Sequence, residues 1–280
     1  ANLKIGADLT SAVTLSSNSD LAFRGVSFIG NGFVITKDEA NYFKPSDTVN
    51  TPIIRPTRNA KDLTQKCRGY FAVDLFGLTE KRVKDEYPTV YQHLLNTSKV
   101  DRDARAHTKD GAAYAKTWWI FGKPRQEFRE ATKALTNYLV TPMTAKHRNF
   151  LALDADIIPD QGLICFAISD YYILSILTSS IHIHWALAQG GRMGMGNDPR
   201  YNNSRCFETF PFPDLADDSP LKQRLRELGE QLDAHRKRQQ AAHPDLTMTG
   251  MYNVLEKLRT HKTVEAASSR LSPTKDSKRQ

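Results

Sequence analysis

Short apolar segments with alternating side chains dominate the first third of the chain, and a period of two predicts β-strands. The clearest is residues 68–75 (RGYFAVDL), rich in aromatic and β-branched residues. Residues 22–28 and 32–36 alternate in the same way, and the Gly-Asn-Gly turn at 30–32 predicts a hairpin between them. Residues 51–66 contain two prolines among many polar side chains, which predicts a loop.

Farther along, apolar residues recur every three to four positions, the spacing of an amphipathic helix. This pattern predicts helices at 80–95, 124–139 and 169–189. The short apolar segments 148–153 and 162–169 are bounded by Asp, Pro and Gly, so we predict strands there.

The C-terminal part has a different pattern. A leucine stripe predicts a charged helix at 220–240, and a shorter helix at 249–258 follows the break at Pro244. Asp198-Pro199 is expected to lie in a loop, and the polar, basic residues 263–280 are expected to be disordered. The chain is therefore predicted to be a mixed α/β (α+β) body that ends near residue 214, followed by a small all-α appendix.

The sequence argues against a membrane protein and against a secreted protein. The longest uncharged apolar run, 173–188, contains Ser, Thr and two His, and it falls short of the roughly 18 apolar residues that a membrane span needs. The chain start lacks the pattern of a signal peptide. Three widely spaced cysteines, Cys67, Cys165 and Cys206, argue against a disulfide framework. We therefore expect a cytoplasmic protein without a membrane partner.

The net charge of +8 is unevenly distributed. Residues 99–148 carry eleven basic and five acidic side chains, whereas residues 149–191 carry four Asp and neither Lys nor Arg. Clustered cations suit nucleic acid, because neutralised phosphates release counterions. A basic solvated face explains the same count equally well, so charge alone decides nothing.

Familiar catalytic motifs are not recognisable. Gly122-Lys123-Pro124 lacks the upstream glycine and the hydroxyl residue of a phosphate-binding loop. His182 and His184 are two residues apart, so on a helix they diverge and cannot share a metal ion, although on a strand they could. Packing positions beside Trp185 are the simpler interpretation. Catalysis is therefore not predicted for this chain by itself.

Features typical of nucleic-acid binding are clearer. Residues 96–107 place three cations after a helix, and residues 115–129 place four around Trp118, Trp119 and Phe121. A Trp-Trp pair is, however, more often part of a core. Residues 189–205 (QGGRMGMGNDPRYNNSR) combine glycines with Arg, Asn and Asp, side chains that read base edges. A flexible loop that joins a helix to an extended segment is an equally good interpretation.

At these residues the sequence resembles a known family. Residues 59–68, WW-x-F at 118–121, TAKHRNF at 144–150, SILTSSIHIHWALAQGGRMGMGNDPRYNNSRCFETFPFP at 175–213 and LTMTGMYNVLEKLR at 246–259 form an ordered series. The series is similar to the C-terminal half of large bacterial adenine-specific DNA methyltransferases of the MmeI-like class. In that class an S-adenosylmethionine-dependent methylase precedes a target-recognition domain and a small helical domain. The resemblance covers roughly residues 8–259.

The resemblance implies a division of the chain. It implies a connector from an absent methylase part at 1–36, a DNA target-recognition domain at 37–214 and a helical domain at 215–262. The chain has no Asn-Pro dipeptide, so it lacks the Asn-Pro-Pro-aromatic motif that holds a flipped adenine. We expect S-adenosylmethionine to act in the parent enzyme and no cofactor to bind here. Double-stranded DNA and the missing methylase are the implied partners, in a restriction-modification or phage-defence system.

The resemblance also implies site residues. Base readout falls to the loop at 189–205, where Arg matches guanine, Asn adenine and Asp the cytosine amine; its candidates are Arg192, Asn197, Asp198 and Arg200. The candidates for DNA-backbone contacts are Lys99, Arg102, Arg105, Lys123, Arg125, Lys146 and Arg148.

Two alternatives remain open. One is a protein-interaction scaffold whose basic face meets an acidic partner. The other is a free-standing enzyme whose site is assembled in space from groups such as His182, His184 or Asp170.

Overall fold

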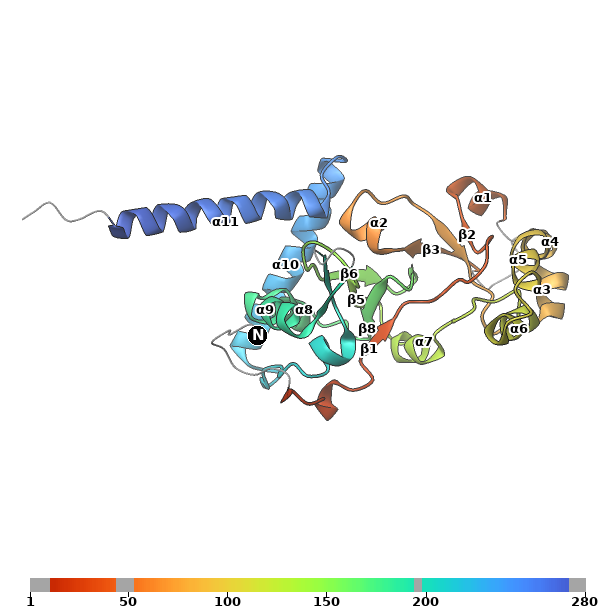
Figure 1. The fold of residues 1–280 in the computed structure, drawn as a ribbon, viewed down its shortest axis with the longest axis horizontal. Coiled ribbons are helices and arrows are strands. Elements are labelled where there is room, and N and C mark those ends of the chain that lie inside the picture. Colours follow the sequence, from red (N-terminus) through yellow and green to blue (C-terminus); the bar gives the residue numbers. More distant parts are fainter. Residues whose placement is uncertain (1–10, 44–52, 194–197, 272–280) are drawn as a thin grey trace, which may run out of the picture.

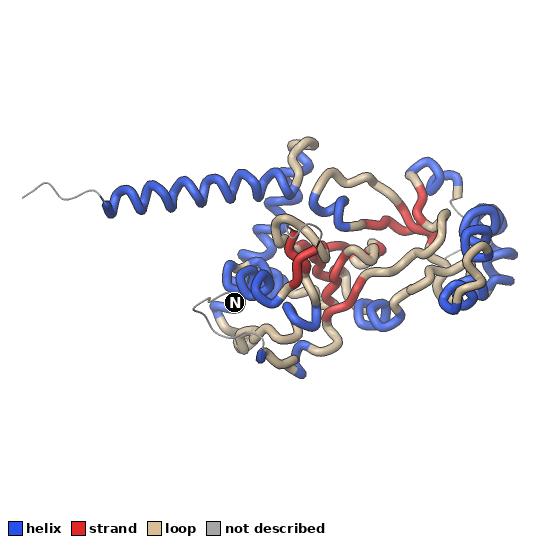
Figure 2. The backbone as a smooth tube through the Cα atoms, in the orientation of Figure 1, coloured by secondary structure: helices blue, strands red, loops and turns tan. Residues whose placement is uncertain are grey.

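The computed structural model describes residues 11–43, 53–193 and 198–271. Its strands form two four-stranded sheets and one separate hairpin (Figure 1). The first sheet has the order β1-β8-β5-β6 and is antiparallel throughout, whereas the second has the order β2-β4-β3-β7 and pairs β3 with β7 in parallel. In Figure 2 the strands lie in the middle of the molecule and most helices lie outside them.

Both faces of the first sheet are buried, because its strands alternate between two apolar clusters. Leu139 of β5 faces one cluster, and Tyr138 and Val140 face the other. Helices α8 and α9 cover the first face, and α2, α7 and the beginning of α11 cover the second. The elements are β1 (Ala22–Arg24), β5 (Asn137–Pro142), β6 (Leu151–Asp154), β8 (Leu163–Phe166), α2 (Ala60–Thr64), α7 (Gln126–Thr132), α8 (Tyr171–Thr178), α9 (Ser180–Gln189) and α11 (Met248–Leu271).

The second sheet shares its apolar core with a group of helices at the other end of the molecule (Figure 1). One of these helices is continuous from α4 to α5 through a π turn, at which Ser98 donates to the carbonyl of Trp118 over 2.9 Å. The elements are β2 (Val34–Ile35), β3 (Ile54–Arg58), β4 (Phe71–Val73), β7 (Ile158–Pro159), α1 (Lys37–Tyr42), α3 (Glu80–Glu86), α4 (Pro88–Leu94), η3 (Leu95–Lys99), α5 (Val100–Asp103) and α6 (Lys109–Lys116).

Helix α10 (Pro220–Ala242) covers the outer edge of the first sheet. Buried Asp233 accepts from the N–H of Ala152 in β6 over 3.2 Å, and Lys237 donates to the carbonyl of Ala152 over 3.0 Å. Buried Arg236 donates to the carbonyl of Phe150 over 2.9 Å. Side chains of the helix thus satisfy an edge strand that would otherwise expose unpaired backbone groups. Helix α10 of the appendix is therefore packed against the body.

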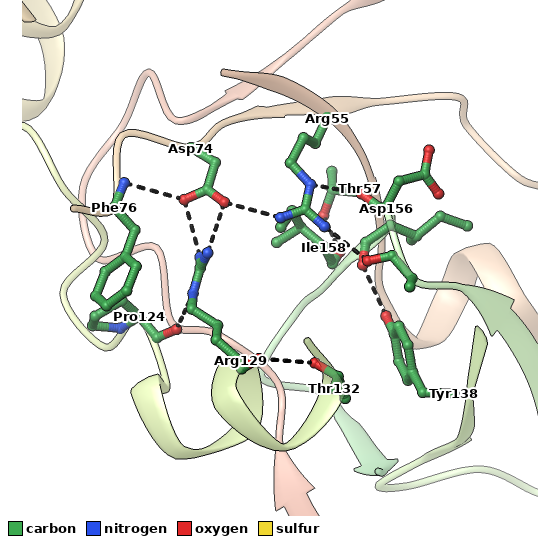
Figure 3. Close-up of polar contacts among 12 residues, drawn as sticks. Arg55, Thr57, Asp74, Phe76, Pro124, Arg129, Thr132, Tyr138, Asp156 and Ile158 are labelled. Carbon is green, nitrogen blue, oxygen red and sulfur yellow. Dashed lines mark hydrogen bonds and ion pairs between the residues drawn. The ribbon is translucent and has the colours of Figure 1, made fainter. Parts of the chain in front are cut away.

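An ion-pair network ties the two sheets together (Figure 3). Asp74, just after β4, accepts two hydrogen bonds from Arg129 of α7, at 2.8 and 3.0 Å, and one from Arg55 of β3 at 3.3 Å. Arg55 also donates to the carbonyls of Ala155 and Asp156, both over 2.8 Å, in the turn between β6 and β7. Because α7 packs on the first sheet and Asp74 follows a strand of the second, this carboxylate fixes their relative position.

Several predicted elements are confirmed and others are displaced. The strands predicted at 68–75, 148–153 and 162–169 correspond to β4, β6 and β8, and the helix predicted at 220–240 corresponds to α10. The helix at 80–95 is interrupted before Pro88, and the helix at 169–189 is interrupted at Ser179, which caps α9 by accepting from the N–H of His182.

Other predictions were wrong. Residues 22–28 and 32–36 do not pair as a hairpin, because β1 joins the first sheet and β2 the second. Segment 1–36, which was predicted to be a connector, supplies one strand to each sheet. Segment 51–66 contains β3 and α2 in place of a loop, segment 124–139 holds α7 and then the start of β5, and Asp198-Pro199 lies in a strand. Helix α11 extends to Leu271, into the segment expected to be disordered.

In the described part of the chain, no helix combines the length and the apolarity needed to cross a bilayer.

Candidate nucleic-acid interface

The segment predicted to read bases forms a two-stranded hairpin. Strand β9 (Gly191–Met193) pairs antiparallel with β10 (Asp198–Arg200), so that Arg192 lies opposite Pro199. Arg192 and Asp198 are exposed, and Arg200 is half-buried. Asn197, the remaining base-readout candidate, lies outside the described residues. Three of the four candidates are therefore brought together on one small ribbon.

The base of this hairpin is held tightly by the body of the protein. Tyr201, directly after β10, is 1% exposed, and its N–H donates to the carbonyl of Met143 over 2.7 Å. Gly190, directly before β9, approaches so closely that an added Cβ would lie 2.4 Å from the carbonyl oxygen of Arg200. Thr144 forms a β-bridge to Arg200. The exposed part of the hairpin thus stands on a buried, well-packed base.

Arg148 belongs to this base, which contradicts its assignment to DNA phosphates. The residue is 6% exposed, and its guanidinium donates to Thr141 Oγ1 over 3.1 Å, to the carbonyl of Pro142 and to the carbonyl of Pro199 over 2.9 Å. It also lies 5.3 Å from the centre of the Tyr201 ring. Burial lowers the pKa of Arg148 to about 10, so it remains a cation at neutral pH. A cation enclosed in this way cannot reach a phosphate.

His182 completes the base of the hairpin. It is fully buried in α9, with Nδ1 2.9 Å from the carbonyl of Leu177 and Nε2 3.2 Å from the hydroxyl of Tyr201. A carbonyl only accepts, so Nδ1 carries the proton and Nε2 accepts from Tyr201. Burial, together with the nearby charge of Arg148, lowers the pKa of His182 to about 4. His184 on the same helix is exposed, so the two histidines diverge.

Lys146 connects the hairpin region to α11. Its Nζ donates to Asn253 Oδ1 over 2.7 Å and lies 3.9 Å from Glu256, and His147 lies 2.8 Å from the same amide oxygen. Lys146 remains exposed, so it is compatible with a phosphate contact. The TAKHRNF segment therefore links β10 to α11.

The first group of backbone candidates lies at the opposite end of the molecule. Arg102 is 2% exposed, and it donates to the carbonyls of Phe28, Ile29, Tyr114 and Thr117 over 2.8–3.1 Å. Burial lowers the pKa of Arg102 to about 10. Its assignment to DNA was wrong, because its guanidinium closes the junction of three chain segments.

Two neighbours of this arginine remain candidates for DNA-backbone contacts. Arg105 is exposed in the turn between α5 and α6. Lys99 pairs with Asp103 at 2.5 Å and is about one-third exposed. Two of the three cations in segment 96–107 therefore remain candidates for DNA-backbone contacts.

Lys123 and Arg125 lie between the two ends. Lys123 is exposed, and its backbone N–H and carbonyl both form 3.0 Å hydrogen bonds with the backbone of Ser27. Arg125 is half-buried and donates to the carbonyl of Gly25 over 3.2 Å, and burial lowers its pKa. Arg24 also repels Arg125, so these two cations are neighbours. Exposed Arg24 was not among the predicted DNA contacts, although its polar position in an alternating strand is a signal that it faces outward.

The residues that were candidates for the site of a free-standing enzyme have structural roles. Asp170 accepts from the N–H of Tyr172 at the start of α8 and forms two 2.8 Å bonds with Arg226, and these contacts lower its pKa. Trp118 is buried, and the indole of Trp119 donates to the carbonyl of Leu78 over 2.9 Å, so the pair belongs to the core. Within the described residues, no three His, Cys, Asp or Glu side chains gather as a metal site.

Comparisons with known proteins agree with this architecture. The structure of the Type IIL restriction-modification enzyme MmeI in complex with DNA aligns with a TM-score of 0.65 at 19% identity, covering 91% of this chain and 33% of that one. DNA methyltransferase A of Bacillus subtilis (strain 168) is 32% identical over 95 residues, which are 32% of this chain and 10% of that protein. The chain thus spans a small part of both relatives. The family model of the MmeI target recognition domain matches residues 12–214, and the chain belongs to that family.

Proposed function

We propose that this chain binds double-stranded DNA and reads its sequence with the β9–β10 hairpin, as part of an S-adenosylmethionine-dependent adenine methyltransferase. The observation that carries the proposal is the hairpin itself. A two-stranded ribbon fits the major groove of B-DNA, where each base pair presents a distinct pattern of donors and acceptors. This ribbon exposes Arg192 and Asp198 on a buried base. Arg192 matches guanine and Asp198 the amine of cytosine, and Asn197 remains a candidate for adenine.

The remaining backbone candidates serve the phosphates in this proposal. They are exposed Arg105, Lys123 and Lys146, with half-buried Lys99 and Arg125. Phosphate contacts set orientation and affinity, and base contacts set specificity. The division at 37–214 and 215–262, with a methylase located elsewhere in the parent protein, completes the proposal. Methyl transfer and the cofactor belong to that other part.

Asp198→Ala is expected to separate specificity from affinity. If Asp198 accepts from a cytosine amine, its loss should reduce discrimination at one base pair by about 1–3 kcal/mol. Because a negative charge near phosphates disappears, binding to random duplexes should become slightly tighter. Sequencing of duplexes selected by each variant from a random pool measures the first effect, and fluorescence anisotropy measures the second.

The matched control for this variant is Asp154→Ala, because Asp154 is exposed at the end of β6, away from the hairpin. It should leave the selected motif unchanged. An identical motif for wild type and Asp198→Ala would remove Asp198 from base readout.

Arg105→Ala is expected to weaken all duplexes alike. Each phosphate contact contributes about 0.9 to the slope of log K against log salt, so the slope should fall by about that amount while the selected motif stays the same. Lys84→Ala is the control, since Lys84 is an exposed cation on α3 in the same part of the molecule. An unchanged slope for Arg105→Ala would show that Arg105 does not contact a phosphate.

A further inference from the structure

Arg148, like Arg102, is a buried charge whose hydrogen bonds go to neutral oxygen atoms. Enclosing an ion in protein costs several kcal/mol unless its donors are well satisfied. The acceptors come from two segments: Thr141 and Pro142 at the end of β5, and Pro199 in the middle of β10. One guanidinium therefore spans the body of the protein and the hairpin.

The bond to Pro199 is placed where it affects base readout directly. Pro199 lies between the two readout candidates Asp198 and Arg200 and pairs with Arg192 across the hairpin. Its carbonyl also accepts from the N–H of Ala145 over 3.4 Å. A shift at this carbonyl moves all three candidate side chains together, and base readout requires side chains held within about 0.5 Å of their productive geometry.

We infer that Arg148 is a positioning residue for sequence recognition: without touching DNA, it sets the pose of the β9–β10 hairpin and thereby the base pairs that the hairpin prefers. This inference rests on the proposed function. The planar fork of arginine reaches acceptors on two segments at once, whereas the ammonium of lysine is a compact point charge. Lysine at this position keeps the charge and loses the fixed geometry.

Tyr201 and His182 also hold the base of the β9–β10 hairpin in place. The bond from the Tyr201 hydroxyl to His182 joins the end of the hairpin to α9, and the Tyr201 ring lies beside the Arg148 guanidinium. Removal of that hydroxyl changes neither charge nor ring size. Tyr201→Phe therefore provides a second, milder disturbance of the hairpin base.

The experiment compares wild type, Arg148→Lys and Tyr201→Phe by selection from a random duplex pool, and by anisotropy at two salt concentrations. We expect wild type to enrich a motif. Arg148→Lys should bind random duplexes with unchanged affinity and salt slope, and its preference for the motif should fall about tenfold, the equivalent of one base contact. Tyr201→Phe should lose part of that preference. All measurements are made well below the melting temperature of each variant, so that an effect on stability alone leaves the preference unchanged.

Three results would overturn the inference. An unchanged motif preference in Arg148→Lys would show that Arg148 has a purely structural role. If that variant fails to fold, an unchanged motif preference in Tyr201→Phe would show that the hairpin base does not set base readout. A fall in the affinity for random duplexes in Arg148→Lys, at an unchanged salt slope, indicates a direct contact of the arginine with DNA, because lysine keeps the charge and loses only the fixed geometry of the guanidinium. If wild type binds duplexes without enriching a motif, or does not bind, the proposed function fails and the inference fails with it. Arg205→Ala, which removes an exposed cation just after the hairpin, is the matched control and should keep the motif.

Discussion

Asp74→Ala is expected to destabilise the protein by about 3 kcal/mol, because it leaves two arginines without their carboxylate. Breaking a buried pair costs about 3–5 kcal/mol, and the lower end applies since the Arg55 and Arg129 side chains are 24% and 17% exposed. The Asp74 side chain is 6% exposed, so water hardly competes for its carboxylate. Urea unfolding followed by circular dichroism measures the effect as a lower midpoint with an unchanged slope.

Asp85→Ala is the matched control. Asp85 pairs with Lys81 at 2.8 Å on the exposed surface of α3, and such pairs contribute at most about 1 kcal/mol. A double variant of Asp74 and Arg129 should lose less than the sum of the single variants, because the two side chains share one interaction. Equal losses for Asp74→Ala and Asp85→Ala would show that the junction between the sheets does not depend on this carboxylate.

Local patterns predicted those elements whose apolar residues keep one spacing along their whole length. The buried strand β8 and helix α10 are examples, although two leucines of the α10 stripe, Leu221 and Leu228, are 57% and 43% exposed. Segment 124–139 was misread because its last residues, 135–139 (LTNYL), place apolar side chains at a spacing that fits a helix, whereas pairing with β8 makes the end of this segment a strand. Segment 51–66 was misread because its prolines outweighed a capping signal: Asn59 and Asp62 form a reciprocal capping box at the start of α2.

The errors at the candidate interface arise because a local sequence pattern does not show tertiary contacts. Sequence identifies a cation but not its burial, and burial divides Arg102 and Arg148 from Lys146 and Arg105. Arg102 and Arg148 both bind backbone carbonyls from segments distant in sequence, which no local pattern records. The hairpin was located correctly as an unusual segment. Its strands were missed because Asp198-Pro199 is typical of a turn, although proline is tolerated in an edge strand.

The stability of the protein is expected to fall between pH 6.5 and pH 4 through His182. The pKa of His182 is about 4 in the folded protein, against an ordinary value of 6.5, and burial is the main cause. The unfolded chain therefore binds more protons in this window, so folding loses free energy as the pH falls, and the loss is complete below pH 4. Each pKa unit corresponds to 1.36 kcal/mol, which predicts a loss of about 2–3 kcal/mol between pH 7 and pH 4.5. Urea unfolding at a series of pH values measures it.

Two glutamine variants isolate this histidine from the other titrating groups. His182→Gln should be less stable than wild type at pH 7, because it changes a fully buried contact to Tyr201, but its stability should vary much less over the same pH window. His184→Gln, on the exposed side of the same helix, should keep the pH dependence of wild type. Carboxylates with shifted pKa values, such as Asp170, whose pKa is lowered, and Asp160, whose pKa is raised by burial, titrate alike in wild type and in both variants, so the difference between the curves reports His182. Parallel curves for wild type and His182→Gln would mean that the imidazole reaches water. In that case the base of the hairpin opens in solution, and the buried His182–Tyr201 contact does not hold it in place.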